Sequence, residues 1–508
     1  MKDIRRLAAA TFILVMSVNS YSRPITAVLR LKEKVRIEDL AANVLSPVSL
    51  HYQKPFSPEE LKRISAPSEK DYQNLISNLK SNGFKIMSES KTHLWISVRA
   101  DQSLFENVFS TRIQKLSKNK YRNLLDVKIP NDLSQVANVS GLDNTRKAFP
   151  KFIVAKASSD QPQGVSQSAI KSAYAFDAIY QSGITGKGQH IAIATYDGFN
   201  IDDVTYFYNA SKLNPSPSVD QVKFNGDAVY SENSAMETQL DAEFAGMIAP
   251  GASVHVFASA TNDDAGELQL FTSILDDNRA KVVNYSWGSC EPLVTPSHRD
   301  EMAKVFARAV AQGVNILVAS GDSGSDSCQD GTNRADWPAA NPDVVAVGGT
   351  TLAIASDTSV TETAWNGSGG GISGVWDLPS YQNALGAPYL KRSYPDVAFN
   401  ADPASGQAIW AHLYGRATWV VIGGTSMAAP QWSGFLALVA ESRAQRTKQT
   451  LGFLNPIIYS LSNLERANLF RDIIEGANGT YKAGPGWDAV TGFGSMRADV
   501  FLEKLTGI

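Results

Sequence analysis

The sequence predicts an α/β fold with a buried parallel sheet, preceded by a small α+β domain. Three observations lead to this prediction. Beyond residue 167, short and almost continuously apolar runs alternate with helical stretches, which is typical of parallel strands covered on both faces. Residues 23 to about 152 are instead rich in Lys, Glu and Ser. Between the two regions, residues 155–167 form a polar Gly/Pro/Ser stretch that indicates an exposed linker and a processing region.

The chain begins with the pattern of a secretory signal. Lys2, Arg5 and Arg6 precede the apolar run "LAAATFILVMSV", and small polar residues follow it. The run is too short to span a bilayer well, so we expect a signal peptide over residues 1–22 and an exported protein, extracellular or periplasmic. The alternative is a buried N-terminal helix. No later segment is apolar enough to predict a membrane helix, so we expect no membrane partner.

The small domain is expected over residues 23–160. Helical periodicity marks "SPEELKRI" and "SEKDYQNLISNLKSNGF", and "HLWISVRA" has the composition of a strand. The large domain is expected over residues 165–508, with strands in "HIAIATYD", "ASVHVFAS", "KVVNYSWG", "VNILVASGDSG" and "DVVAVGG". A chain of 508 residues exceeds the usual size of one core, which agrees with this division.

Composition excludes some partners. The sequence is 43% hydrophobic and 19% charged, and its formal net charge is −3, which is ordinary for a globular protein. No basic block suggests nucleic acid, so we expect none as a partner.

The stretch "GGTSMAAPQWSG" places Ser426 between a turn and an apolar helical run. A serine at a helix start lies beside unpaired backbone N–H groups, which favour a developing anion. A serine hydroxyl needs an adjacent base to become a nucleophile, and that base is usually histidine. None of the six histidines is a convincing partner for Ser426. His51 and His93 lie in the small N-terminal region, His190 and His255 lie in strand-like runs, and His298 and His412 have no glycine-rich or acidic setting that marks a catalytic base.

Carboxylates offer a better base. Glu237 and Asp241 are four residues apart in a helical segment that Pro250 and Gly251 end, so both project from one face. Two carboxyls this close share a proton, and such a pair can act as a general base in acid. The alternative is a solvated acidic helix face.

A third acid directly follows an apolar strand. Asp322 lies in the Gly/Ser turn of "VASGDSGS" and, when protonated, could donate to an oxyanion; an Asx-turn is the alternative. The chain has two cysteines, Cys290 and Cys328, both after strand-end segments. In an exported protein we expect them to form a disulfide, the alternative being two separate buried thiols.

Together "ETQLD", "SGDSG" and "GGTSMAAP", in this order, resemble the sedolisins, the serine-carboxyl peptidases that share the subtilisin-like fold and use glutamate in place of histidine. The resemblance implies four roles. Glu237 would be the general base, Asp241 its carboxyl partner, Asp322 the oxyanion donor and Ser426 the nucleophile. "HYQKPFSPEELKRI" similarly resembles the family's activation prodomain, which implies that residues 23–160 inhibit or assist the folding of the peptidase domain.

Further segments imply binding sites. By resemblance "SWG" and "SGGG" would flank a peptide substrate, which pairs with them as an added strand. The residues expected to do so are Ser286, Trp287, Gly288, Gly369 and Gly370. "RDIIEGANGTYKAGPGWDAVTGFG" resembles the family's calcium site, which implies one Ca²⁺ held by Asp472, Ile473, Gly484, Gly486 and Asp488.

These observations predict a secreted endopeptidase that is made as a proenzyme and cleaves polypeptides in acid through a Ser426 acyl-enzyme. We expect a monomer and no redox or organic cofactor. Two other interpretations stay open: a subtilisin-type protease with a distant histidine base, and a catalytically inactive binding relative.

Overall fold

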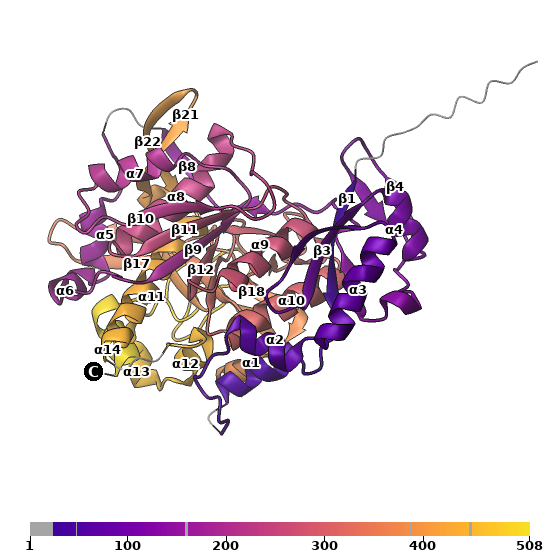
Figure 1. The fold of residues 1–508 in the computed structure, drawn as a ribbon. Helices are drawn as coiled ribbons and strands as arrows, with labels where there is room; N and C mark the ends of the chain where they lie inside the picture. Colours follow the sequence, from indigo (N-terminus) through magenta and orange to yellow (C-terminus); the bar gives the residue numbers. More distant parts are fainter. Residues whose placement is uncertain (1–23, 47, 158–160, 387–388, 447–449, 508) are drawn as a thin grey trace, which may run out of the picture.

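The computed structural model describes residues 24–46, 48–157, 161–386, 389–446 and 450–507. The predicted signal peptide, residues 1–22, lies outside this part of the chain. Figure 1 shows two units: a small unit (residues 24–148) and a large unit (residues 161–507). The connecting segment, residues 149–157, passes from the small unit to the opposite side of the large one.

The small unit is an antiparallel sheet covered by helices, as the sequence predicts. Its sheet has the strand order β2-β3-β1-β6. The bounds are β1 (Ile25–Leu31), β2 (Lys85–Glu89), β3 (Trp95–Ala100), β6 (Val136–Ser140), α1 (Ile37–Leu45), α2 (Pro58–Ser65), α3 (Glu69–Ser81) and α4 (Gln102–Val108). Ser57 begins α2 with a capping box to Glu60, which explains why the helix starts where "SPEELKRI" predicts.

The large unit is built on a mainly parallel sheet of strand order β10-β11-β9-β12-β14-β16-β20-β24-β23, with β17 paired to β16. The pairs from β10 to β24 are parallel, and the predicted apolar runs form its central strands. The bounds are β9 (His190–Thr195), β10 (Ser218–Val222), β11 (Ser253–Ala258), β12 (Val282–Tyr285), β14 (Asn315–Ala319), β16 (Val345–Ile354), β17 (Val360–Ala364), β20 (Val397–Asn400), β23 (Phe470–Arg471) and β24 (Ser495–Met496).

Two long, buried helices pack against each other beside this sheet. They are α8 (Glu232–Ile248) and α11 (Thr425–Arg446), and Gly434 of α11 allows their close approach, because a Cβ there would lie 2.7 Å from Cβ of Ile248. The other helices are α5 (Gln167–Ala173), α6 (Phe176–Gln181), α7 (Ile201–Ala210), α9 (Asp264–Asp277), α10 (Pro296–Ala311), α12 (Leu454–Ser460), α13 (Asn463–Leu469) and α14 (Ala498–Thr506).

Short strands receive the connecting segment. One group contains β7 (Phe149–Pro150), β13 (Trp287–Cys290) and β15 (Asp336–Trp337), and another contains β8 (Ile153–Ala157), β21 (Gln407–Leu413) and β22 (Arg416–Gly423). Both strands of the connecting segment, β7 and β8, therefore pair with the large unit.

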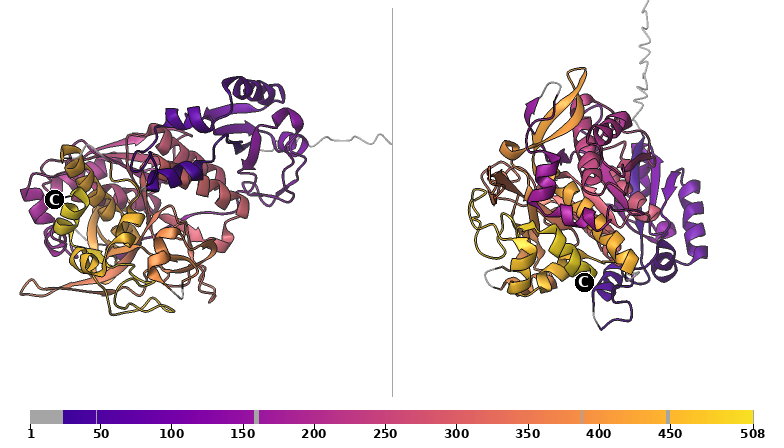
Figure 2. Two further views of the ribbon diagram at one scale, coloured as in Figure 1. Left: turned by 90° about the horizontal axis from the view of Figure 1, so that it is seen from below. Right: turned by 90° about the vertical axis from the view of Figure 1, so that its left-hand side faces the viewer.

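The small unit packs on α9 and α10 of the large unit, through β1 and α1, and both views in Figure 2 show it on the outside of the larger body. Ion pairs cross this boundary. Arg30 Nε lies 2.7 Å from Glu301 Oε1, and Lys304 Nζ lies 2.6 Å from Glu38 Oε1.

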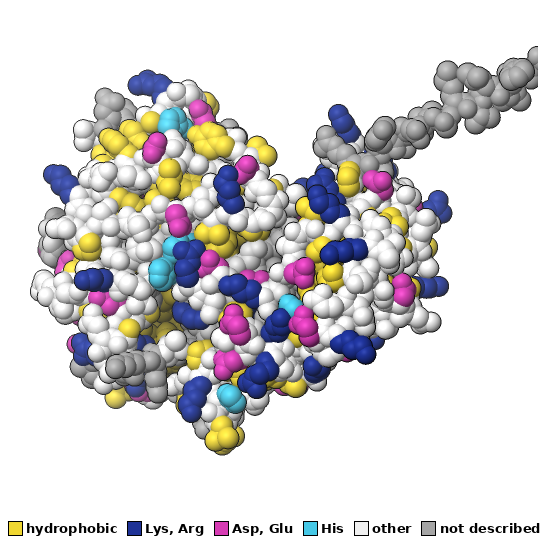
Figure 3. All heavy atoms as spheres, viewed as in Figure 1, with side chains coloured by type: hydrophobic (Ala, Val, Ile, Leu, Met, Phe, Trp, Pro, Cys, Tyr) yellow, Lys and Arg dark blue, Asp and Glu magenta, His cyan; other side chains and the backbone are white. Residues whose placement is uncertain are grey.

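On the face shown in Figure 3, basic and acidic side chains are interspersed, and neither sign forms a continuous patch. Within the described ranges, no helix is both long enough and apolar enough to cross a membrane.

Candidate active site

Ser426 lies in the first turn of α11 and is fully buried, at the helix start that the sequence predicts. Its Oγ donates a hydrogen bond to Glu237 Oε2 at 3.0 Å. The preceding Gly424 has a φ of 108°, and a Cβ there would lie 2.4 Å from the Lys151 carbonyl oxygen. Only glycine fits this turn without strain, because the turn needs a positive φ and a side chain at this position would collide with the connecting segment.

Glu237 and Asp241 project from one face of α8, and both are fully buried. Asp241 Oδ1 accepts a 2.6 Å hydrogen bond from Ser286 Oγ. Glu237 Oε1 and Asp241 Oδ2 have no hydrogen-bond partner within the described residues. Burial raises the pKa of both carboxyls well above the usual range, and for Glu237 the charge of Asp241 adds to it. Both carboxyls therefore keep a proton to higher pH than free carboxyls do, and Glu237 presents Oε2 to Ser426.

Asp322 directly follows β14, as predicted, and lies beside the start of α11. Its Oδ1 accepts 2.8 Å hydrogen bonds from the backbone N–H and the hydroxyl of Thr425. Its Oδ2 lies against Gly424, where an added Cβ would come within 2.5 Å of it, and has no hydrogen-bond partner in the described part of the chain. Burial raises the pKa of Asp322 to about 7, so this carboxyl is protonated in acid and can donate.

The connecting segment passes directly over Ser426. Upstream, Pro150 pairs with Trp287 and Phe149 with Gly288, antiparallel. Downstream, β8 pairs antiparallel with β22. Between these strands, the backbone N–H of Ser426 donates to the Lys151 carbonyl oxygen at 2.9 Å. The segment therefore lies as an extended strand on both sides of the serine.

Lys151 also contacts the predicted base through its backbone. Its N–H donates to Glu237 Oε2 and to the carbonyl oxygen of Ser286, both at 3.1 Å. Glu237 Oε2 therefore accepts two hydrogen bonds, one from the Ser426 hydroxyl and one from the Lys151 N–H. The carbonyl of the same Lys151 bonds to the Ser426 N–H.

Comparison with known proteins gives consistent matches over most of the chain. A family described as "Pro-kumamolisin, activation domain" matches residues 19–145, and the "Subtilase family" matches residues 225–494. Kumamolisin of Bacillus sp. (strain MN-32) is 37% identical over 412 residues, which cover 75% of this chain and 72% of that protein. This chain belongs to the sedolisin family of serine-carboxyl peptidases. It is a zymogen: the small unit is the activation prodomain and the large unit the peptidase domain.

Other relatives extend this match. Sedolisin of Pseudomonas sp. (strain 101) is 29% identical and covers 92% of this chain and 84% of its own. Tripeptidyl-peptidase 1 of Canis lupus familiaris is 27% identical and covers 95% of this chain and 91% of its own. A solved structure of Pseudomonas sedolisin complexed with pseudo-iodotyrostatin superposes with a TM-score of 0.61 at 29% identity, over 68% of this chain and 99% of that one. The predicted subtilisin-like fold is confirmed.

The histidines of this sedolisin-family chain lie elsewhere. His298 and His412, for which the sequence shows no acidic setting, both have acidic partners in the structure: His298 Nε2 lies 2.7 Å from Glu267 Oε2, and His412 Nδ1 lies 2.8 Å from Asp203 Oδ2. Tertiary contacts supply these acids, so local sequence could not show them. None of the six histidines, all of which are described, hydrogen-bonds to Ser426.

The residues expected to bind substrate divide into two groups. Ser286, Trp287 and Gly288 all bond or pair with the connecting segment. The structure does not bring the other two to it by hydrogen bonds. Gly369 N–H donates to the Gly321 carbonyl oxygen at 2.7 Å, and a Cβ at Gly370 would collide with the backbone of Ala489.

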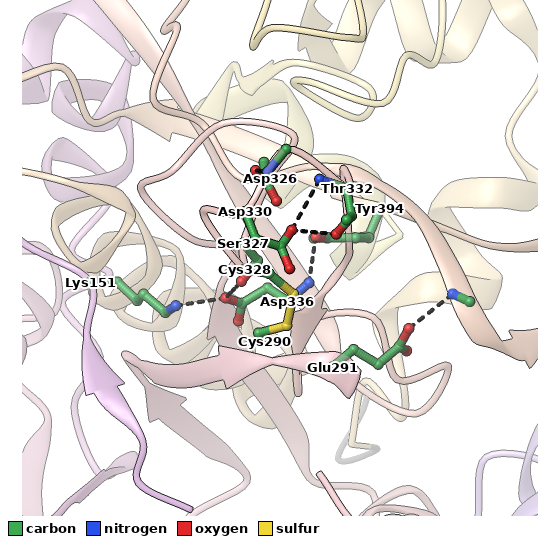
Figure 4. Close-up of a disulfide and its surroundings, with 12 residues drawn as sticks. Lys151, Cys290, Glu291, Asp326, Ser327, Cys328, Asp330, Thr332, Asp336 and Tyr394 are labelled. Atoms are coloured by element: carbon green, nitrogen blue, oxygen red, sulfur yellow. Dashed lines mark hydrogen bonds and ion pairs between the residues drawn. A yellow bond between two sulfur atoms is a disulfide. The ribbon is translucent and has the colours of Figure 1, made fainter. Parts of the chain in front are cut away.

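Cys290 and Cys328 form a disulfide in the structure, with their Cα atoms 4.9 Å apart. Figure 4 shows this bond beside Asp336, whose carboxylate the amine of Lys151 approaches from one side. It fastens the end of β13 to the loop that follows Asp322, so two strand-end loops of the peptidase domain are tied together.

The predicted calcium ligands lie around one glycine-rich loop. Asp472 Oδ2 accepts from the N–H of Gly486 at 2.8 Å, and Asp488 Oδ2 accepts from the N–H of Gly484 at 3.3 Å. Ile473 is buried beside the loop. Neither aspartate forms an ion pair with Lys or Arg within the described residues. Two carboxylates that accept from N–H groups of one glycine-rich loop and form no ion pair within the described residues fit the charged part of an all-oxygen calcium site.

Two residues beside the active site, Lys151 and Asp336, could not be predicted from the sequence. Lys151 lies in an ordinary "FPKFIV" stretch, and Asp336 follows the basic residue of "RADW". Both are placed by contacts between distant parts of the chain, since their side chains meet across 185 residues.

Proposed function

We propose that this protein hydrolyses peptide bonds in acid through an acyl-enzyme on Ser426. The observation that supports this most directly is the hydrogen bond from Ser426 Oγ to Glu237 Oε2 at 3.0 Å, with a peptide carbonyl bonded to the Ser426 N–H. No described histidine competes for this position.

The chemistry proceeds in two halves. Glu237 takes the hydroxyl proton as Ser426 Oγ bonds to the carbonyl carbon, and the tetrahedral oxyanion accepts from the Ser426 N–H and from protonated Asp322. The C–N bond then breaks, and Glu237 gives its proton to the leaving amine. In the second half water attacks the acyl carbon and loses its proton to Glu237, and Glu237 returns that proton to Ser426 Oγ as the acyl C–O bond breaks. Asp241 shares and orients the proton of Glu237.

The extended path of the connecting segment supports endopeptidase action. β7 continues backward to Ala148, whose N–H and carbonyl both bond to the Asn262 side chain, at 2.8 and 2.9 Å. β8 continues forward along β22. A chain that passes the nucleophile in both directions needs no free amino terminus nearby, so we infer cleavage within polypeptides.

The same segment gives the prodomain an inhibitory role. While residues 149–157 lie on β13 and β22, no other polypeptide can pair with those strands. We infer export as a proenzyme, from the signal pattern of residues 1–22, and activity as a monomer.

We also propose that one Ca²⁺ binds at Asp472 and Asp488, with carbonyls of Ile473, Gly484 and Gly486 completing the ligands. The ion would order the 484–488 loop and takes no part in the chemistry.

Incubation of the purified precursor with a denatured protein between about pH 3 and 8 tests this function. We expect internal fragments in acid, and none from a Ser426→Ala variant. Equal activity of the two proteins, or no cleavage at any pH, would favour an inactive binding relative.

A further inference from the structure

Charge is divided unevenly between the two units, although the whole sequence has a formal net charge of only −3. Residues 24–148 contain 20 Lys and Arg against 13 Asp and Glu, a net charge of +7. Residues 161–508 contain 21 Lys and Arg against 35 Asp and Glu, a net charge of −14. The prodomain is therefore a basic unit carried on an acidic enzyme.

One hairpin of the prodomain concentrates exposed basic side chains. It consists of β4 (Ile113–Lys115), β5 (Tyr121–Asn123) and the loops beside them, and we call residues 112–128 the basic hairpin. It has one acid and six exposed basic side chains, which are Arg112, Lys115, Lys118, Lys120, Arg122 and Lys128. Of these six, only Arg122 forms an ion pair within the described residues, with Asp143 at 3.6 Å. The other five charges face solvent.

Apolar side chains lie among these charges. Leu116, Leu124 and Leu125 of the basic hairpin are 46%, 47% and 55% exposed. Exposed basic and leucine side chains on one element are typical of segments that bind an anionic bilayer, where the charges meet phospholipid headgroups and the leucines enter the boundary beneath them. A soluble polyanion needs the charges alone, so the leucines favour a lipid surface.

The basic hairpin is fastened to the rest of the prodomain. The Tyr121 N–H donates to Asn144 Oδ1 at 2.8 Å, and the Tyr121 hydroxyl donates to the Gly141 carbonyl oxygen at 3.1 Å. Asn144 Nδ2 donates to the Asn119 carbonyl oxygen at 2.9 Å, within the loop that joins the two strands. Because the backbone is already held in place, binding requires little further ordering of it.

The basic hairpin also lies beside the start of the described chain. A cleft of about 330 Å³ lies between its loop and the start of β1, and Figure 1 shows β4 next to β1. The lining includes Pro24 and Ile25 of the N-terminal end and Lys118 and Lys120 of the hairpin. Pro24 follows the predicted signal peptide, residues 1–22, by two positions. A precursor whose signal peptide is still in the bilayer therefore has the basic hairpin at the membrane surface.

We propose that the basic hairpin docks the precursor on an anionic phospholipid surface, so that the mature enzyme, which lacks the hairpin, is free to leave it. Docking from one side needs no spanning helix, and the described residues contain none. The expectation of no membrane partner rested on spanning segments alone. Because the hairpin and Ser426 lie in different units, this binding is independent of the proposed catalytic chemistry.

Electrostatics explains both halves of the proposal. Each Lys or Arg near an anionic surface strengthens binding about fivefold, so three of them contribute about a hundredfold. The attraction extends only about 10 Å at 0.1 M salt, so high salt should weaken it. An anionic surface repels the peptidase unit, whose net charge is −14, once the prodomain has been separated from it.

Vesicle flotation at about pH 7 tests the docking. The protein is the Ser426→Ala precursor beginning at residue 23, so that neither the signal peptide nor processing contributes. We expect it to bind vesicles of phosphatidylcholine mixed with phosphatidylglycerol, and to bind phosphatidylcholine alone at least about tenfold more weakly. High salt should release it from the anionic vesicles. Equal binding to both lipids, or binding to neither, would overturn the proposal.

Processed wild-type enzyme gives the second half of this test. It lacks the basic hairpin, so it should not bind the anionic vesicles; binding equal to that of the precursor would overturn the proposal. A precursor that never processes would contradict the proposed function instead, because the vesicle assay of the Ser426→Ala precursor does not depend on activity.

Charge variants then assign the binding to the hairpin. One triple variant neutralises three lysines of its loop: Lys115→Gln, Lys118→Gln and Lys120→Gln. The matched control neutralises three exposed lysines elsewhere in the prodomain: Lys70→Gln, Lys80→Gln and Lys85→Gln. Affinity for anionic vesicles should fall about a hundredfold in the first and much less in the control. Equal losses in both would show attraction to the basic unit as a whole and would remove the hairpin from the account.

Leucine variants distinguish a bilayer from a soluble polyanion. Replacement of Leu116, Leu124 and Leu125 by Ser removes apolar area without changing the charge. Affinity for anionic vesicles should fall at least about tenfold, while retention on a polyanionic column should equal that of the wild type. All these substitutions alter exposed side chains, and an unchanged melting temperature confirms that each variant is folded. Vesicle binding that survives the loss of the leucines would mean that the hairpin binds polyanions in general, which would overturn docking on a bilayer.

Discussion

Two helices of the peptidase domain each bury carboxylates, and their surroundings give these groups opposite properties. On α8, Glu237 and Asp241 form no ion pair with Lys or Arg within the described residues, and burial raises the pKa of both. On α9, Glu267 is equally buried, but Arg146 of the prodomain and His298 bond to it. Burial opposes its ionisation, yet these two neighbours outweigh burial and hold the pKa of Glu267 at about 2.

The difference shows that burial alone does not decide what a carboxylate does. Without a cation, the α8 pair binds a proton more tightly and can exchange it with a serine, which suits a catalytic role. With a cation, the α9 carboxylate stays charged and holds the prodomain in place, which is a structural role. For Glu267 the folded pKa is lowered, so its contribution to stability is present above the usual range near 4.5 and is lost only as pH falls through about 2. Moderate acid therefore leaves the ion pair of Glu267 intact.

Removing the proton acceptor of α8 should give the largest effect. In Glu237→Gln the amide cannot take the Ser426 proton, so kcat should fall roughly 10⁴-fold while the melting temperature is maintained. Glu243→Gln is the matched control: Glu243 is fully buried on the same helix and accepts from the Trp410 N–H at 3.1 Å, whereas the serine hydroxyl donates to Glu237. Comparable losses in both variants would show that any buried acid on α8 matters only for folding.

Removing Arg146, the cation that pairs with the α9 carboxylates, should leave Glu267 buried without a guanidinium, as Glu237 and Asp241 are on α8. Arg146→Met leaves Glu267 and Asp264 buried without their guanidinium, so the free energy of unfolding of the precursor should fall by about 3 to 5 kcal/mol. Denaturant unfolding of the Ser426→Ala precursor, with and without Arg146→Met, measures this. Processed enzyme lacks residue 146 and serves as the control. Identical unfolding midpoints would mean that the ion pair does not fasten the prodomain.

Variants of Asp322 can distinguish the effect of a carboxyl's charge from its ability to donate a hydrogen bond. Asp322→Ala removes the donor, and kcat should fall about 10² to 10³-fold. Asp322→Asn keeps a neutral donor that does not titrate, so it should retain more activity than Ala and lose less as pH rises through about 7, where wild-type Asp322 ionises. Equal kcat for Asn and Ala at all pH values would argue against oxyanion donation.

Asp472 and Asp488 represent a third case, in which we expect a metal ion, and not a basic side chain, to balance the charge of the carboxylates. A hundredfold excess of Ca²⁺ over its dissociation constant should stabilise the folded protein by about 2.7 kcal/mol, which raises the melting temperature. Asp472→Asn still accepts from the Gly486 N–H but lacks the charge, so its response should be much smaller. Asp357→Asn, an exposed loop variant, should respond like the wild type. No response in the wild type would leave an ordinary turn.

The sequence allows the prediction of features that depend on neighbours along the chain. The four-residue spacing of Glu237 and Asp241, the helix start at Ser426 and the turn after the strand that precedes Asp322 are all local patterns. That these residues lie together in the fold was predicted only from the family resemblance, because the arrangement of the sheet, and not local sequence, brings them together. The partners of Lys151 and Arg146 could not be predicted, since they lie 185 and 121 residues away and depend on how the prodomain docks.

The pH dependence of kcat/KM for processed enzyme tests the central claim most directly, because it reports the protonation of the free enzyme. With an uncharged peptide as substrate between about pH 3 and 8, we expect the highest value in acid and a decline as pH approaches 7, where Asp322 ionises at a pKa of about 7 and can no longer donate. An optimum at or above pH 7 would contradict the serine-carboxyl mechanism.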